Sequence, residues 1–327
     1  MDSTQPAKTP ANQISHQLHR HLGLPAAPNC MLLLDPVLRP ISDADAIAER
    51  HWEYSYTPVR LAPHVDPTEW PQLVSFDVTK FSGSEYLALS VEDACEELAP
   101  EALRTGAGRR IGGWLATRAS AKEVAKHLAR TMVQNRPGDG PTWLRVHDPA
   151  VMWWLWSFLS PGQRRLLLGP VDTLWILDPS GQLVALRAEV ATTKGNTAPL
   201  ALTDDLWRDV DCIAPLNLAL REWARASALD QRIDPLCTGA LDAVRRAMAA
   251  GFHSKRDLTA YAQYALKVHP RFDAHLDVQK LIAQRRSTDY FTRLVDGLNE
   301  EDWKRIAREC VASDAVEQPV GQTQKNR

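Results

Sequence analysis

The sequence predicts an α+β or α/β amino-terminal lobe with a mostly buried sheet flanked by helices, followed by an all-α carboxy-terminal lobe. Between residues 31 and 190, short apolar runs alternate with helical patterns, which is typical of layered α and β structure. From residue 201 onward the apolar spacing is helical. A chain of 327 residues is long enough for about two domains.

The elements of the amino-terminal lobe follow from the period of its apolar residues. The predicted strands are 31–35, 72–78, 111–117, 142–146, 173–177 and 182–188. The predicted helices are 84–98, 120–134, 149–158 and 160–168. Ser120 and Glu123 have the spacing of a capping box, which marks the start of the second helix. The face of that helix expected to cover the sheet carries Val124, His127, Leu128 and Met132.

Composition sets the domain boundaries. Residues 1–12 and 312–327 are polar and short of large apolar side chains, so we expect disordered tails. The segment 192–200, TTKGNTAPL, collects turn-forming residues at the point where the strand patterns stop. It is predicted to be a linker between an α/β domain at 13–191 and a helical domain at 201–311.

Capping residues mark helix ends in the carboxy-terminal lobe. Two N-caps are predicted, at Ser254 and at Asn299, whose side-chain oxygens can accept hydrogen bonds from amides of the first helical turn. Asp257 and Asp302 stand three residues later, where a carboxylate completes the cap. Gly251 is placed to end the preceding helix.

Charge and cysteine content exclude several classes of protein. The net charge is −2, so no overall field favours nucleic acid or an anionic membrane. The five cysteines are odd in number, scattered and never in a CxxC pair, which predicts reduced thiols. The start, MDSTQPAKTPANQ, lacks the pattern of a secretory leader, and no apolar run reaches about 18 residues. We therefore expect a cytoplasmic protein with no membrane and no nucleic-acid partner.

Residues 143–159, WLRVHDPAVMWWLWSFL, contain four tryptophans. Asp148 is a predicted N-cap, and Pro149 suits the first helical position. The following helix carries aromatic side chains on more than one face, at Trp153, Trp154, Trp156 and Phe158. Such a helix is either core or a partly exposed docking surface.

Arg145 and His147 are candidate site residues. Arg145 is predicted to lie on a strand between apolar neighbours, where an unpaired guanidinium is costly, so it should bind a carboxylate. The candidate partners are Asp148, Asp172 and Asp178. A structural ion pair is favoured over a catalytic role, and a structural imidazole is favoured for His147.

Catalytic and ligand-binding patterns are weak. The glycine-rich segment 105–113, TGAGRRIGG, lacks the Lys-Ser/Thr of a phosphate loop and precedes a strand. His16, His19 and His21 could ligate a metal only with a further converging ligand, and a solvated helix face is the favoured interpretation.

Two other patterns bear on catalysis. No GxSxG elbow is present, and the carboxylate pairs at 96–97 and 300–301 are predicted to be exposed helix positions. We expect no enzyme activity, no cofactor, no metal and no catalytic residue.

The tryptophan-rich region resembles domain-of-unknown-function family 4123, the adaptor or chaperone proteins of bacterial type VI secretion systems. The residues that carry the resemblance are Arg145, His147, Asp148-Pro149, LSPGQ at 159–163, Gly169-Pro170 and Trp175. Upstream, MLLLDPVL, WPQLVSFD and HLARTM resemble earlier family elements, so the likeness covers about residues 31–178. The departures are His147, where an aromatic is usual, and LLLGP, where aromatics often precede Gly-Pro.

The resemblance implies a cytoplasmic adaptor that binds a secreted toxic effector and promotes its loading onto the spike protein. The family-signature and candidate partner-binding residues are Arg145, His147, Asp148, Pro149, Trp153, Trp154, Trp156, Gly169, Pro170 and Trp175. The alternatives are a regulatory or structural protein-binding scaffold outside secretion and, less favoured, a hydrolase.

Overall fold

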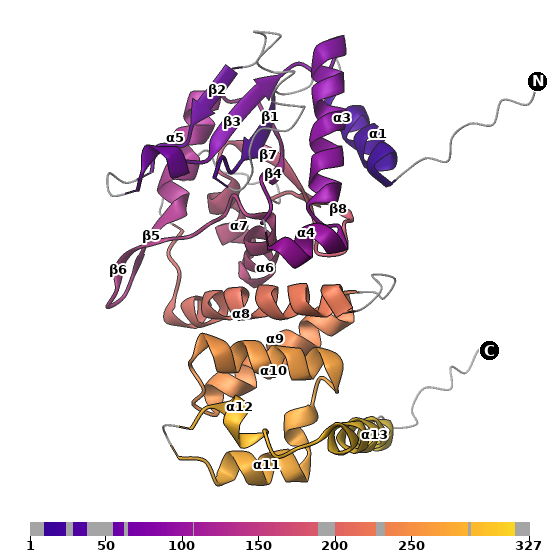
Figure 1. Ribbon diagram of the computed structural model, residues 1–327. Coiled ribbons are helices and arrows are strands. Elements are labelled where there is room, and N and C mark those ends of the chain that lie inside the picture. The colour runs from indigo at the N-terminus through magenta and orange to yellow at the C-terminus, as the bar shows by residue number, and fades with distance from the viewer. Residues whose placement is uncertain are drawn as a thin grey trace, which may run out of the picture. The chain divides into compact units, whose positions relative to one another are not determined.

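The computed structural model has two compact units, residues 1–210 and 211–327 (Figure 1). The described residues are 10–23, 29–37, 55–61, 65–106, 108–188, 200–226, 233–286 and 289–317. Unit 1 holds a sheet with flanking helices and unit 2 holds helices, which confirms the predicted fold class. Most of the predicted linker, residues 192–199, lies outside the described residues.

Among the described residues, the main sheet of unit 1 has six strands in the order β2-β3-β1-β4-β7-β8. All its pairings are antiparallel, which selects α+β over α/β. The strands are β1 (Asn29–Leu34), β2 (Ser55–Pro58), β3 (Gln72–Phe76), β4 (Ile111–Thr117), β7 (Val171–Leu177) and β8 (Leu183–Leu186). The apolar pattern predicts all of these except β2.

Helices cover both faces of this sheet. The helices are α1 (Pro10–Leu22), α3 (Phe81–Glu96), α4 (Pro100–Thr105), α5 (Ala121–Met132), α6 (Pro149–Phe158) and α7 (Pro161–Leu168), with a 3₁₀ turn η1 (Pro67–Glu69). Leu32 on β1 packs in a cluster with Tyr86 of α3, while the adjacent Leu33 is also buried. Because neighbouring strand residues point to opposite faces, both faces are buried. On the face opposite α3, α5 contacts β2 and β3, and α6 contacts β4 and β7.

A hairpin after α5 corrects two predicted elements. Helix 120–134 ends at Met132, and β5 (Val133–Arg136) pairs with β6 (Gly140–Trp143). Gly138 and Gly140 both have positive φ, so the intervening segment turns tightly. Strand 142–146 is also wrong beyond Trp143, because the chain leaves the hairpin there.

The ordered helices reach into both predicted tails. α1 begins at Pro10, a residue suited to the first helical turn, and it buries Ile14, Leu18 and Leu22 on one face. α13 (Glu300–Glu317) continues past residue 312. Residues 1–9 and 318–327 lie outside the described residues.

Unit 2 is built around aromatic side chains. Its helices are α8 (Asp204–Ala226), which begins in unit 1, α9 (Ile233–Ala249), α10 (Lys255–Lys267), α11 (Leu276–Ala283), α12 (Phe291–Leu294) and α13, with a 3₁₀ turn η2 (Phe272–Ala274). Tyr261 packs against both Phe272 and Phe291 in the core. The predicted caps are confirmed, since Ser254 accepts from the Asp257 amide and Asn299 from the Asp302 amide. The predicted stop at Gly251 is also confirmed by its φ of 83°.

Candidate functional site

Asp35, Arg145 and His147 meet in one polar cluster of unit 1, which we call the Asp35 cluster. Arg145 Nη2 donates to Asp35 Oδ2 at 2.8 Å, and His147 Nε2 lies 3.0 Å from the same oxygen. The side chain of Asp35 is 5% exposed and that of Arg145 39%, while His147 is fully buried. Arg145 is therefore ion-paired, as predicted, but at a different carboxylate.

The predicted partners Asp148, Asp172 and Asp178 are wrong because the loop after β6 passes against β4 and reaches Asp35, just after the end of β1. Gly112 on β4 permits this close approach, since a Cβ there would lie 2.5 Å from the His147 carbonyl oxygen. The path of the loop places Arg145 beside Asp35, 110 residues upstream. Arg145 thus lies in a loop and not on a strand.

Burial, taken alone, raises the pKa of Asp35. The hydrogen bond and charge of His147, the Val37 amide and the Arg145 charge together outweigh burial, so the pKa lies below its usual value. The carboxylate is therefore ionised at neutral pH and holds β1 to the loop after β6.

Trp143 covers the Asp35 cluster. Its ring stacks on His147 with centroids 5.8 Å apart, and the Arg145 guanidinium lies 5.3 Å from its centroid. Trp143 Nε1 and His147 Nδ1 are buried and have no hydrogen-bond partner in the described part of the chain. The cluster combines one ion pair with ring packing.

Asp148 and Pro149 begin α6 as predicted. Asp148 Oδ1 accepts from the Ala150 amide at 2.9 Å, and Pro149 occupies the first helical turn. The Asp-Pro step therefore ends the loop that carries Arg145 and His147 and begins helix α6.

The tryptophans of α6 differ in burial. Trp154 is buried and packs edge-on against Trp153, with ring centroids 4.6 Å apart. Trp153 and Trp156 are partly exposed, and the Arg164 guanidinium lies 5.2 Å from the Trp156 centroid. The helix is thus core on one side, with a partly exposed side whose role in partner binding stays a prediction.

The last signature residues make contacts within unit 1. Gly169 ends α7 with a φ of 54°, and a Cβ there would lie 2.2 Å from the His127 ring. The carbonyl of Pro170 accepts from the Thr117 hydroxyl at 2.6 Å. Trp175 is buried on β7 opposite Trp114 of β4.

Glu97 is a buried carboxylate that the sequence pattern misses, because a Glu-Glu pair after a helix is usually solvated. Its carboxylate accepts from the amides of Arg110 and Ile111 at 2.9 and 3.2 Å. The glycine-rich segment therefore gives amide donors to Glu97. Nearby, burial lowers the pKa of Arg109, which donates to the Leu177 carbonyl.

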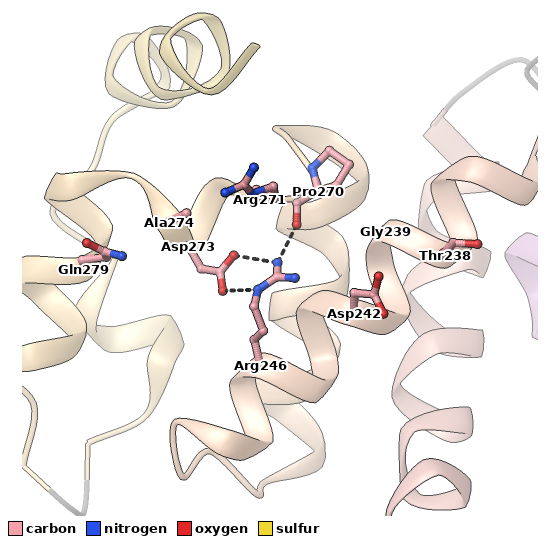
Figure 2. A pocket seen from close by; sticks show the side chains of 9 residues that line it. All are labelled: Thr238, Gly239, Asp242, Arg246, Pro270, Arg271, Asp273, Ala274 and Gln279. Carbon is pink, nitrogen blue, oxygen red and sulfur yellow. Dashed lines mark hydrogen bonds and ion pairs between the residues drawn. The ribbon is translucent and has the colours of Figure 1, made fainter. Parts of the chain in front are cut away.

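Unit 2 contains a pocket of about 480 Å³ between α9 and η2 (Figure 2). Arg246 donates to both carboxylate oxygens of Asp273, each at 2.8 Å, and to the Pro270 carbonyl. The hydrogen bond to Asp273 is the main cause that raises the Arg246 pKa. Arg246 is thus ion-paired with a carboxylate of the same pocket.

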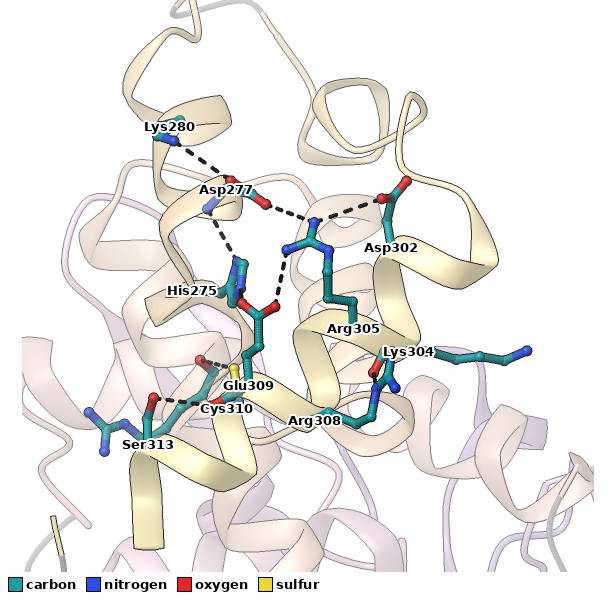
Figure 3. Close-up of polar contacts among 11 residues, drawn as sticks. His275, Asp277, Lys280, Asp302, Lys304, Arg305, Arg308, Glu309, Cys310 and Ser313 are labelled. Carbon is teal, nitrogen blue, oxygen red and sulfur yellow. Dashed lines mark hydrogen bonds and ion pairs between the residues drawn. The ribbon is translucent and has the colours of Figure 1, made fainter. Parts of the chain in front are cut away.

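A second polar network in unit 2 joins α11 to α13 (Figure 3). His275 Nε2 lies 2.7 Å from Glu309, and Arg305 donates to Asp277 at 2.8 Å. The hydrogen bond from Arg305 lowers the Asp277 pKa, and that from His275 lowers the Glu309 pKa. The Asp277 and Glu309 side chains are 36% and 53% exposed.

Within the described ranges, no group of three His, Cys, Asp or Glu side chains is placed to hold a metal ion. The exposed His16, His19 and His21 lie on α1. The five cysteines form no disulfide with one another. No helix in the described ranges has the length and apolar character needed to cross a bilayer.

Comparison with known proteins gives one family. No curated protein and no solved structure matches the chain. Residues 71–166 match the family described as Domain of unknown function (DUF4123), a shorter span than the predicted 31–178. The match includes Arg145, His147 and Asp148 but excludes Asp35 and Trp175. Through this segment, which runs from β3 into α7, the chain is similar to the DUF4123 family.

Proposed function

We propose that this protein is a cytoplasmic adaptor that binds a toxic effector of a type VI secretion system and promotes its loading onto the spike protein. The observation that carries the proposal is the DUF4123 domain at residues 71–166, which contains most of the adaptor-like signature. That signature ties β1 to the loop before α6 and starts α6, because Arg145 and His147 both bind Asp35 and Asp148 caps the helix.

Two features are suited to a protein-binding role. The partly exposed Trp153 and Trp156 of α6 supply aromatic side chains of the kind enriched at interfaces. The chain also has two compact units, so effector and spike protein can each have a surface of their own.

The test is co-expression of the full-length chain with the effector encoded beside it, followed by affinity purification. We expect a stable complex, and reduced effector secretion from a strain that lacks this protein. Trp156→Ala should weaken the complex, while the exposed β7 variant Asp172→Ala serves as its matched control. If the effector does not co-purify, and is soluble and fully secreted without this protein, the adaptor proposal is wrong.

A further inference from the structure

A groove of about 960 Å³ lies on unit 1 between strand β2 and helix α5. Apolar and small side chains line part of it, namely Leu61, Ala125, Ala129 and Val133. The two alanines on the lining face of α5 leave room beside β2, which the helix contacts. The groove therefore has space and apolar surface for an extended chain.

The charged side chains that line this groove are all basic among the described residues. Lys122, Lys126 and Arg130 are spaced four apart on α5, and Arg60 follows β2. Because residues four apart share one helix face, three cations form a row along the groove. All four cations are solvent-exposed.

The acidic side chain of this helix, Glu123, is hydrogen-bonded at the start of α5. Glu123 Oε2 accepts from the Ser120 amide at 2.8 Å and from its hydroxyl at 2.7 Å. Its carboxylate is held at the start of α5 as half of the capping box. The row of cations is a local feature, since the whole chain has a net charge of −2.

The composition of β2 indicates how an occupant is held. β2 is the outer strand of the described sheet, and its Pro58 has no N–H to give to an added strand. Pro58 thus removes one backbone donor from this edge, and the groove side chains offer the other contacts: cations for carboxylates and an alanine-lined surface for apolar groups.

We propose that this groove binds an acidic, extended segment of the effector, which rests on the adaptor function proposed above. Complementary charge accelerates encounter and selects the partner. The attraction acts over about 8 Å at physiological salt, so binding weakens as salt increases.

Fluorescence anisotropy of a labelled peptide that repeats Val-Glu-Thr-Asp tests the proposal with the full-length protein. We expect this peptide to bind and a matched Val-Gln-Thr-Asn peptide not to bind. Lys122→Glu/Lys126→Glu should weaken binding at least about tenfold. The control Arg20→Glu/Lys80→Glu changes the net charge equally at exposed sites outside the groove lining, and should preserve the affinity.

A second variant separates a binding defect from a folding defect. Ala129→Trp fills the groove without changing charge and should also abolish peptide binding, with the far-ultraviolet circular dichroism spectrum preserved. Lys122 lies in the first turn of α5, where glutamate is favourable, so the charge-reversed helix is expected to fold.

Three outcomes would overturn the groove assignment. One is equal peptide binding by wild type and Lys122→Glu/Lys126→Glu. Another is binding of the peptide only after residues Asp43, Asp45, Glu49 and Glu53 are neutralised, which would make the chain's own acidic segment the occupant. A third is undiminished co-purification of the effector with the charge-reversed protein, which would leave the adaptor function standing without this groove.

Discussion

The Asp35 cluster of unit 1 and the α11–α13 network of unit 2 use the same chemistry at different depths. In each, Arg and His side chains bind carboxylates across elements distant in sequence, by 110 residues for Asp35 and 28 for Asp277. Asp35 is almost fully buried, whereas Asp277 and Glu309 are substantially exposed. Because water competes for exposed charges, the contact pattern alone does not give the stability that each contributes.

The largest expected effect is that of Asp35→Ala. The variant leaves His147 buried and removes the partner of Arg145, so the free energy of unfolding should fall by about 3 kcal/mol. Urea unfolding measures this loss, and Asp172→Ala on the exposed side of β7 should change it by less than about 0.5 kcal/mol. Equal stability of the two variants would mean that the buried cluster contributes no more than a surface site.

Gly112→Ala tests the close approach that brings the Asp35 cluster together. The new Cβ would lie 2.5 Å from the His147 carbonyl oxygen, so the loop must shift, at a cost of about 2 kcal/mol. Gly162→Ala in α7 is the control, because a Cβ there meets nothing within 4 Å. A thermal unfolding midpoint of Gly112→Ala equal to that of the control would contradict the proposed close approach.

Acid should diminish the contribution of Asp35. Its pKa in the folded state lies below the unfolded value of about 3.9, so the stability it provides is complete above that value and is lost as pH falls through the folded pKa. The difference in unfolding free energy between wild type and Asp35→Asn should therefore be constant above about pH 5 and shrink below about pH 4. A difference that persists undiminished at lower pH would show that the charge of Asp35 is not what stabilises the fold.

Asp148→Ala should cost about 1 kcal/mol, the usual value for a lost N-cap. Asp148 is not the partner of Arg145, which binds Asp35, so no loss of an ion pair is added to this cost. Asp148→Ser keeps an oxygen that can accept from the Ala150 amide and should restore most of the stability in urea unfolding. Equal stability of Asp148→Ala and wild type would rule out the capping role.

Local signals in the sequence predict their elements correctly. The capping box at Ser120, the N-cap at Asp148 and the stop at Gly251 each depend on residues within one helical turn. The apolar runs of β1, β4 and β7 are also local, and their burial on both faces matches the sheet. These features give the fold class and the start of α6.

The Asp35 cluster could not be predicted, since its geometry depends on topology. Nothing near Arg145 in the sequence indicates that the end of β1 lies beside it. Three other carboxylates are closer to Arg145 in sequence than Asp35 is, namely Asp148, Asp172 and Asp178. Glu97 is missed for a related reason, because its partners, the amides at 110 and 111, become neighbours only when β4 joins the sheet. Contacts across the sheet are thus the part that local patterns do not specify.

The smallest expected effect is that of Asp277→Asn in unit 2. Its partner Arg305 can still bind Glu309 and remains hydrated, so the urea midpoint should be unchanged at physiological salt and fall slightly at low salt. The backbone amide of residue 277 donates to His275 Nδ1, and this hydrogen bond is retained in the variant. A loss of stability as large as that of Asp35→Ala, or one insensitive to salt, would show that the α11–α13 network stabilises its unit as a buried cluster does. The exposure of the charged side chains would then not distinguish the two regions.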